Sequence, residues 1–186
     1  MKYFFILFIV LLTLSACQKN EIKEAFDCTN TIYFSNTKEY HDVLKHFKIN
    51  IPKRWGTKLY YDEFQSELYS ADTLKQLSET YIIDITWHQG ELVFNSDFEQ
   101  KVDQNLLTTE QLKTVRSGYG KFKDHSAYYN LSQGKKTDFD YRYLQIYVKY
   151  KTDEYYTFTS KIYGNEFVSE RLCESVSLFE SISFIE

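Results

Sequence analysis

Alternating hydrophobic and polar positions predict most of the strands in this chain. Every second residue from Tyr81 to Trp87 is apolar, and in the run 141–150 the residues Leu144, Ile146 and Val148 alternate with tyrosines and polar residues. A period of two is the pattern of a β-strand with two different faces. Runs of the same kind, separated by turn residues, predict further strands at 48–55, 59–69, 112–122, 125–131 and 155–162.

Apolar residues three and four positions apart predict three helices. They are Tyr40, Val43, Leu44 and Phe47 in the first, Phe98, Val102 and Leu106 in the second, and Val168, Leu172, Val176 and Phe179 in the third. The corresponding predictions are a short helix over 37–46, a helix over 97–107 and a closing helix over 165–180. Ser96 and Glu99 fit a capping box for the second helix, and Asn165 is placed to cap the third.

The first residues have the pattern of an export signal. Lys2 precedes an unbroken apolar run from Tyr3 to Leu12, and small residues follow it. The run is shorter than the ~20 apolar residues that cross a bilayer, so residues 1–16 are predicted to be a signal peptide. The ending 14–17, Leu-Ser-Ala-Cys, resembles a bacterial lipobox, which implies that Cys17 is lipidated and holds the protein on a membrane. An ordinary signal peptide with a chance cysteine is the alternative.

The residues after Cys17 refine the expected location. Gln18 stands where inner-membrane lipoproteins of enteric bacteria carry Asp, and 18–21 resembles the lipoprotein export signal of some Bacteroidetes. We therefore expect an envelope protein, most plausibly on the outer membrane, on its periplasmic or its surface side. The alternative is that 18–21 carries no such signal and is plain solvated chain, and in either case residues 17–30 are expected to form a polar tether. Residues 31–186 are then expected to form a single domain.

Composition excludes some classes and leaves others open. Aromatic residues make up 18% of the 186 residues, which argues against disorder, and the net charge of −4 gives no indication of nucleic-acid binding. With Cys17 lipidated, Cys28 and Cys173 remain. In an exported protein two such cysteines are expected to form a disulfide, although two buried free thiols are an alternative.

The order of the elements predicts an α+β fold. Strands near both ends, short hairpins and few helices favour a central antiparallel β-sheet flanked by helices on both faces. The run 47–52, Phe-Lys-Ile-Asn-Ile-Pro, followed by Trp55, resembles the PsbP-like family, whose fold is shared by the Mog-type Ran-binding protein. The resemblance implies an α/β/α sandwich over 47–184. It implies little about activity, because members of the family are mostly non-enzymatic binding or assembly proteins.

No motif in the sequence points to catalysis, to a cofactor or to a metal. His41, His46, His88 and His125 are scattered, and neither metal-binding nor nucleophile motifs are present. The feature with functional potential is the row Tyr141, Tyr143 and Tyr147 on one face of a predicted strand. These rings either stack on a partner or pack beneath a helix.

These observations favour a lipid-anchored envelope lipoprotein that acts as a non-catalytic binding or assembly module for a protein or glycan partner. Two alternatives remain at this point. One is an enzyme or accessory factor that acts on envelope polymers, and the other is a purely structural envelope lipoprotein. A deep pocket with a strongly shifted pKa favours the enzyme, and an aromatic groove favours the binding module.

Overall fold

The computed structural model describes residues 21–28, 32–136 and 138–185. Its helices are α2 (Glu21–Ala25), the 3-10 turn η1 (Leu77–Glu79), α3 (Ser96–Thr109) and α4 (Val168–Phe179). Its strands are β1 (Thr37–His41), β2 (Phe47–Pro52), β3 (Gly56–Tyr61), β4 (Gln65–Ala71), β5 (Tyr81–Gln89), β6 (Lys113–Phe122), β7 (His125–Lys136), β8 (Phe139–Lys149), β9 (Glu154–Tyr163) and β10 (Ser183–Phe184). None of these helices is both long and apolar enough to cross a membrane within the residues described.

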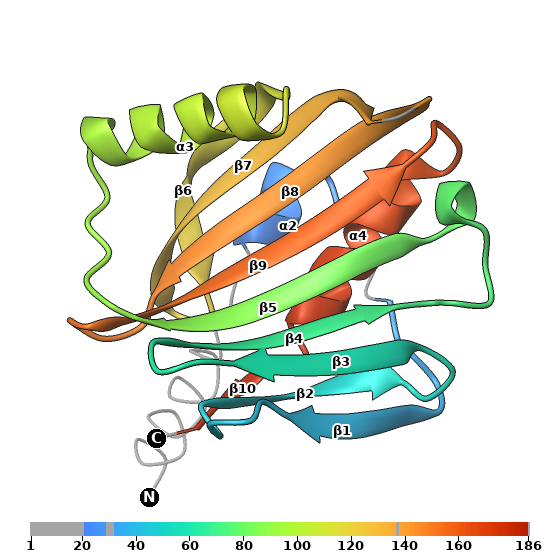
Figure 1. Ribbon diagram of the computed structural model, residues 1–186, viewed down its shortest axis with the longest axis horizontal. Coiled ribbons are helices and arrows are strands. Elements are labelled where there is room, and N and C mark those ends of the chain that lie inside the picture. The colour runs from blue at the N-terminus through green and yellow to red at the C-terminus, as the bar shows by residue number, and fades with distance from the viewer. Residues whose placement is uncertain (1–20, 29–31, 137, 186) are drawn as a thin grey trace, which may run out of the picture.

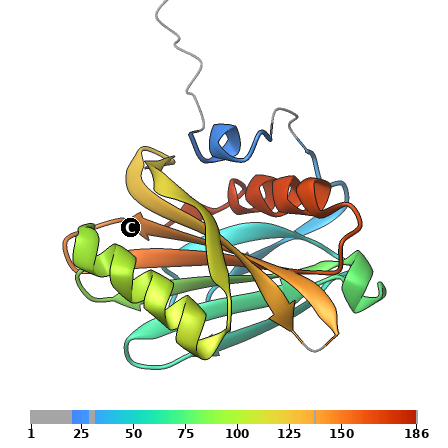
Figure 2. The ribbon, with the colours of Figure 1, turned by 90° about the horizontal axis from the view of Figure 1, so that it is seen from above.

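The strands form one large and one small antiparallel sheet. The large sheet has seven strands in the order β3-β4-β5-β9-β8-β7-β6, and the small sheet has the order β1-β2-β10. Helix α3 lies on one face of the large sheet, whereas α4 and α2 lie on the other (Figures 1 and 2). The predicted α+β class, with a central antiparallel sheet flanked by helices, is confirmed.

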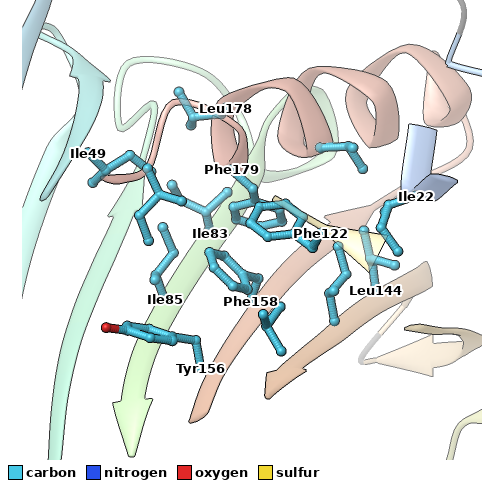
Figure 3. Close-up of a cluster of buried hydrophobic side chains, with 14 of the residues drawn as sticks. Ile22, Ile49, Ile83, Ile85, Phe122, Leu144, Tyr156, Phe158, Leu178 and Phe179 are labelled. Carbon is cyan, nitrogen blue, oxygen red and sulfur yellow. The ribbon is translucent and has the colours of Figure 1, made fainter. Parts of the chain in front are cut away.

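The main core lies between the large sheet and the layer formed by α4, α2 and the small sheet. The alternating residues of β5, β8 and β9 supply its floor, and Val176 and Phe179 of α4 supply its roof (Figure 3). Ile83, Leu144 and Phe158 are completely buried there. The period of two in the sequence therefore identified the buried face of these strands correctly.

The structure corrects the predicted polar tether over 17–30 in its described part. Residues Glu21–Ala25 form α2, and the side chain of Ile22 is fully buried against the main core. A disulfide joins Cys28 to Cys173 of α4, as the cysteine count predicts, and ties this segment to the closing helix. The buried side chains of Ile22 and Phe26, together with the disulfide, hold a segment that looks polar in sequence. Cys17 lies outside the described residues.

Four local predictions were wrong in type or boundary because tertiary contacts or turns override the local pattern. Residues 37–41 form strand β1 rather than a helix, because they pair residue by residue with β2. The predicted strand 59–69 is a hairpin whose turn is held by the carboxylate of Asp62, which accepts from the backbone N–H groups of Phe64 and Gln65 at 2.7 and 2.9 Å. Asn95, not Ser96, caps α3, and α4 begins only after Phe167, which has a left-handed backbone.

Candidate functional site

The three candidate tyrosines of β8 lie under or beside helix α3. Val102 and Leu106 of α3 form a second buried cluster with Leu112, Tyr128 and Tyr141. Tyr141 is completely buried, and Tyr143 and Tyr147 are half-buried beside it. The binding interpretation is therefore wrong for Tyr141, because the helix takes the place that a stacking partner would need. The ring of Tyr147 already has an edge-on aromatic neighbour, Phe98 of α3, at 5.2 Å between centroids.

The same sheet face is uncovered beyond the helix. Figure 1 shows that no described element lies in front of β9, β5, β4 and β3 on the α3 side. We call this region the open face. The strand register brings three charged residues together on it, because Tyr69 of β4 pairs with Asp84 of β5, and Asp84 pairs with Thr159 of β9. Glu67 and Lys161 are two positions along from Tyr69 and Thr159, so they point to the same face.

Glu67 and Asp84 form a pair of interacting carboxyl groups. Burial raises the pKa of Asp84, although Lys161 and the hydroxyl of Thr86, which donates to Asp84 Oδ1 at 3.0 Å, oppose the rise. Burial and then the charge of Asp84 raise the pKa of Glu67. A raised pKa favours the protonated form of a carboxyl group, which donates a hydrogen bond as well as accepting one.

Tyrosines and a lysine surround this pair. The ammonium group of Lys161 lies 5.6 Å from the ring centroid of Tyr69, which is a cation–π distance. Next to them is a cleft of about 500 Å³ that we call the open-face cleft. It is lined by Gly56, Thr57, Lys58, Tyr60, Glu67, Tyr69, Ala71 and Thr73. Its volume is within the range of small-molecule sites, about 300–1,000 Å³.

His88 lies further along the open face. Its Nε2 atom is 2.9 Å from the hydroxyl oxygen of Thr157, and its ring stacks on Tyr155 at 4.6 Å. Burial lowers the pKa of His88 to about 4, so the imidazole is neutral at physiological pH. The other histidines lie elsewhere, with His46 stacked on Trp87 in the neighbourhood of the small sheet. Within the described residues no group of three or more His, Cys, Asp and Glu could hold a metal ion.

Sequence reasoning missed the residues of the open-face cleft and the charged residues beside it, Asp84 and Lys161. The signal was nevertheless present for Asp84, which interrupts an otherwise apolar strand and must lie opposite Ile83 and Ile85. Glu67 and Lys161 gave no such signal, because only the register of three strands brings them to Asp84.

Solved structures share this architecture. CyanoP, the cyanobacterial PsbP protein of Synechocystis sp. PCC 6803, matches over 84% of this chain and 96% of its own, with a TM-score of 0.63 and 8% identity. The fold is PsbP-like. This agrees with the resemblance that the sequence showed over 47–184.

A second structure of this kind is PA94 of Pseudomonas aeruginosa, a protein of unknown function, with a TM-score of 0.50, 12% identity and coverage of 81% of this chain and 99% of that one. LpqN of Mycobacterium tuberculosis, involved in cell envelope biogenesis, covers 92% of this chain and 100% of its own at 11% identity, but its TM-score of 0.42 is too low for any inference. No protein-family model and no curated protein matches the sequence. The PsbP-like fold thus positions the open face without specifying its ligand.

Proposed function

We propose that this protein is a lipid-anchored, non-catalytic binding module of the bacterial envelope, and that it holds a glycan in the open-face cleft. The observation that carries the proposal is the arrangement of Tyr60 and Tyr69 beside the interacting carboxyl groups of Glu67 and Asp84. Tyr60 is half exposed, with 50% of its surface accessible.

The chemistry of this cleft matches that of a sugar. A pyranose ring has apolar C–H faces, which pack on aromatic rings, and a rim of hydroxyl groups, which both donate and accept hydrogen bonds. Tyr60 and Tyr69 supply the rings, while Glu67 supplies a carboxyl group that lines the same cleft. A site with few polar groups among aromatic surfaces is the usual composition of a ligand pocket.

The geometry of the carboxyl groups favours binding over hydrolysis. Glycoside hydrolases hold their two carboxyl groups about 5–10 Å apart so that a glycosidic bond and a water fit between them. Glu67 carries the one carboxyl group among the residues that line the open-face cleft. A sugar bound there has no second carboxyl group of the lining opposite the first, so the cleft is suited to recognising hydroxyl groups.

The envelope location is supported by the lipobox-like segment at 14–17 and by the Cys28–Cys173 disulfide, which suits an oxidising compartment. An anchor at Cys17 lies four positions before α2, a reach of at most about 14 Å. Helix α2 lies on the sheet face opposite the open face (Figure 2). Such an anchor holds the domain close to the membrane with its cleft turned outward, toward envelope polymers.

Binding to purified envelope polysaccharide tests the proposed ligand. The mature chain with Cys17→Ser, which has no acyl group, is titrated with oligosaccharides released from the envelope. We expect Tyr69→Ala and Glu67→Gln each to weaken binding at least tenfold, or about 1.4 kcal/mol. Tyr33→Ala and Glu63→Gln remove an exposed ring and an exposed carboxylate elsewhere, and should bind as the parent does. Equal binding by all five proteins, or none by the parent, contradicts the proposal.

Lipidation is tested separately by mass spectrometry of the protein expressed in a bacterial host. We expect the wild type to carry the mass of acyl chains on residue 17 and to fractionate with membranes, since several buried chains at about 0.8 kcal/mol per methylene make anchoring permanent. The Cys17→Ser variant should lose both properties. A wild type without acyl mass would remove the anchor from the proposal and leave the cleft untouched.

A further inference from the structure

The two edges of the large sheet are treated differently. At the β6 edge, α2 covers the strand: the carboxylate of Glu21 accepts a hydrogen bond from the backbone N–H of Lys121 at 2.9 Å, and the guanidinium of Arg116 donates to the carbonyl of Ala25. A β-bulge between Thr114 and Arg116 further disrupts the strand. Covering and bulging are the usual ways in which proteins prevent a sheet edge from pairing with another chain.

The β3 edge has no such protection among the described residues. Asp62 N–H bonds to the carbonyl of Gln65 at 3.0 Å, which makes this a hydrogen-bonded pair of the β3–β4 hairpin. Hydrogen-bonded and non-bonded pairs alternate along an antiparallel ladder, so Lys58 and Tyr60 bond inward to β4. The N–H and C=O groups of Thr57, Leu59 and Tyr61 consequently point away from the sheet.

The side chains of this edge are apolar and accessible. Leu59, Tyr60, Tyr61 and Phe64 have exposed fractions of 38, 50, 63 and 59%. Lys58 is the one charged residue within the strand. The β1 edge of the small sheet is different, because its five residues include Lys38, Glu39 and His41. An exposed, apolar edge strand with free backbone groups is a template for pairing with another strand.

We propose that β3 pairs antiparallel with β3 of a second copy of this chain, with Tyr60 of both copies on the two-fold axis. The outward-pointing groups of one strand must face those of the other, which leaves only registers that place odd residues opposite odd residues. A register centred on Lys58 sets two like charges opposite each other, and one centred on Leu59 sets each Lys58 opposite Tyr60 and forms no lysine–aspartate pair. The register centred on Tyr60 places Lys58 opposite Asp62 of the second copy and Leu59 opposite its Tyr61.

This register is self-complementary in both charge and packing. It forms two lysine–aspartate pairs on one face and two leucine–tyrosine pairs on the other, where cross-strand pairs each contribute about 0.2–1 kcal/mol. The two large sheets become one continuous sheet. The open-face clefts of the two copies, each of which includes Lys58 and Tyr60, then lie next to each other across the axis. The pairing does not depend on a ligand.

Cysteine crosslinking in the Cys17→Ser background tests the register. Tyr60 faces its own equivalent as a non-hydrogen-bonded pair, in which the Cα atoms are about 4.5 Å apart, a distance that a disulfide spans. Tyr60→Cys should therefore form a covalent dimer under mild oxidation. Lys58→Cys is the matched control, since its equivalent lies four residues away along the strand, about 13 Å, and should not crosslink.

Sedimentation equilibrium tests the dimer itself. The unlipidated parent should have twice the monomer mass at micromolar concentration. Leu59→Pro removes an outward N–H, which β4 does not use, and should give a folded monomer with an unchanged circular dichroism spectrum. A monomeric parent, equal crosslinking of the two cysteine variants, or a dimeric proline variant overturns the proposal. Loss of glycan binding does not, because it tests only the cleft.

Discussion

Among the polar side chains, we expect replacement of Arg171 to destabilise the fold most. It lies in α4 with only 5% of its surface exposed, and burial lowers its pKa. Its guanidinium donates hydrogen bonds to backbone carbonyls rather than to a carboxylate. The acceptors are Ser78 at 3.0 Å, Thr80 and Tyr163 at 2.8 Å each, Glu166 and Phe167. One side chain therefore joins η1, the end of β9 and the start of α4.

The cost of Arg171→Met follows from these bonds. A hydrogen bond from a charged donor contributes about 1.5–3 kcal/mol, and the contributions are not additive within one network. Methionine fills a similar volume but leaves several carbonyls without a donor, so we expect a loss of about 3–5 kcal/mol. That is a large part of the ~5–15 kcal/mol by which a typical domain is stable. Arg171→Lys keeps the positive charge but lacks the planar guanidinium with its several N–H donors. Its loss of stability should therefore be smaller, about 1–3 kcal/mol.

Urea unfolding followed by tryptophan fluorescence measures the effect. With a slope of about 2 kcal/mol per molar urea, the Met variant should unfold at a midpoint about 2 M lower. Arg142→Met is the control, because Arg142 is half-buried and makes one long bond of 3.4 Å to a carbonyl. Its midpoint should change little. A midpoint for Arg171→Met within 0.5 M (roughly 1 kcal/mol) of the wild type would refute the reasoning.

Three further predictions concern covalent and ionisable groups. Cys173→Ser opens a loop with a sequence separation of 145 and should cost up to roughly 5 kcal/mol in urea unfolding; thiol labelling of denatured, unreduced protein should find neither Cys28 nor Cys173 free. The folded-state pKa of His88 is about 4, below its unfolded value of 6.5, so stability should fall by up to about 3 kcal/mol as the pH drops from 6.5 to 4, and His88→Gln should lose this dependence. The pKa of Glu67 is raised in the folded state, so ionisation of Glu67 should lower the free energy of unfolding as the pH rises through that pKa. Glu67→Gln, which cannot ionise, should therefore be more stable than the wild type at pH 7. Below pH 4, where Glu67 is protonated in both states, the two proteins should be equally stable.

Sequence patterns predicted the sheet because alternation is a local property that burial on one face enforces. The strands β5, β8 and β9 were identified with their buried faces because each carries uninterrupted alternation. The segment 37–46 failed for the opposite reason. Its apolar spacing fits a helix, but Asp42 is 2% exposed and its carboxylate accepts from the backbone N–H of Phe47 at 2.7 Å, which turns the chain back into β2. This buried contact and the pairing of 37–41 with β2 together favour the strand over the helix.

The candidate site was harder to predict because two distant features determine which part of a face is open. Tyr141 and Tyr69 both lie on the face that carries α3, yet one is buried and the other lines a cleft. Nothing in their local sequences distinguishes them. The position of α3 does, and it depends on the contacts of Val102 and Leu106 with residues of β7 and β8.

The position of α3 gives the face two kinds of surface. The helix packs over the end of the sheet formed by β6, β7 and β8 and leaves the open face uncovered (Figure 1). One helix covers the tyrosine-rich part of the face, and the remaining part is exposed to water.

Apolar side chains on this exposed part would form a surface patch that promotes aggregation. The chain instead places Glu67 near Asp84, where burial raises both pKa values and the charge of Asp84 raises that of Glu67 further, so that ionising Glu67 is unfavourable for the fold. Residues that lower the stability of the fold at an accessible surface are typical of a functional site, because they are kept for binding rather than for folding. The proposal therefore predicts opposite effects of one substitution: Glu67→Gln should raise the free energy of unfolding at pH 7 and weaken glycan binding.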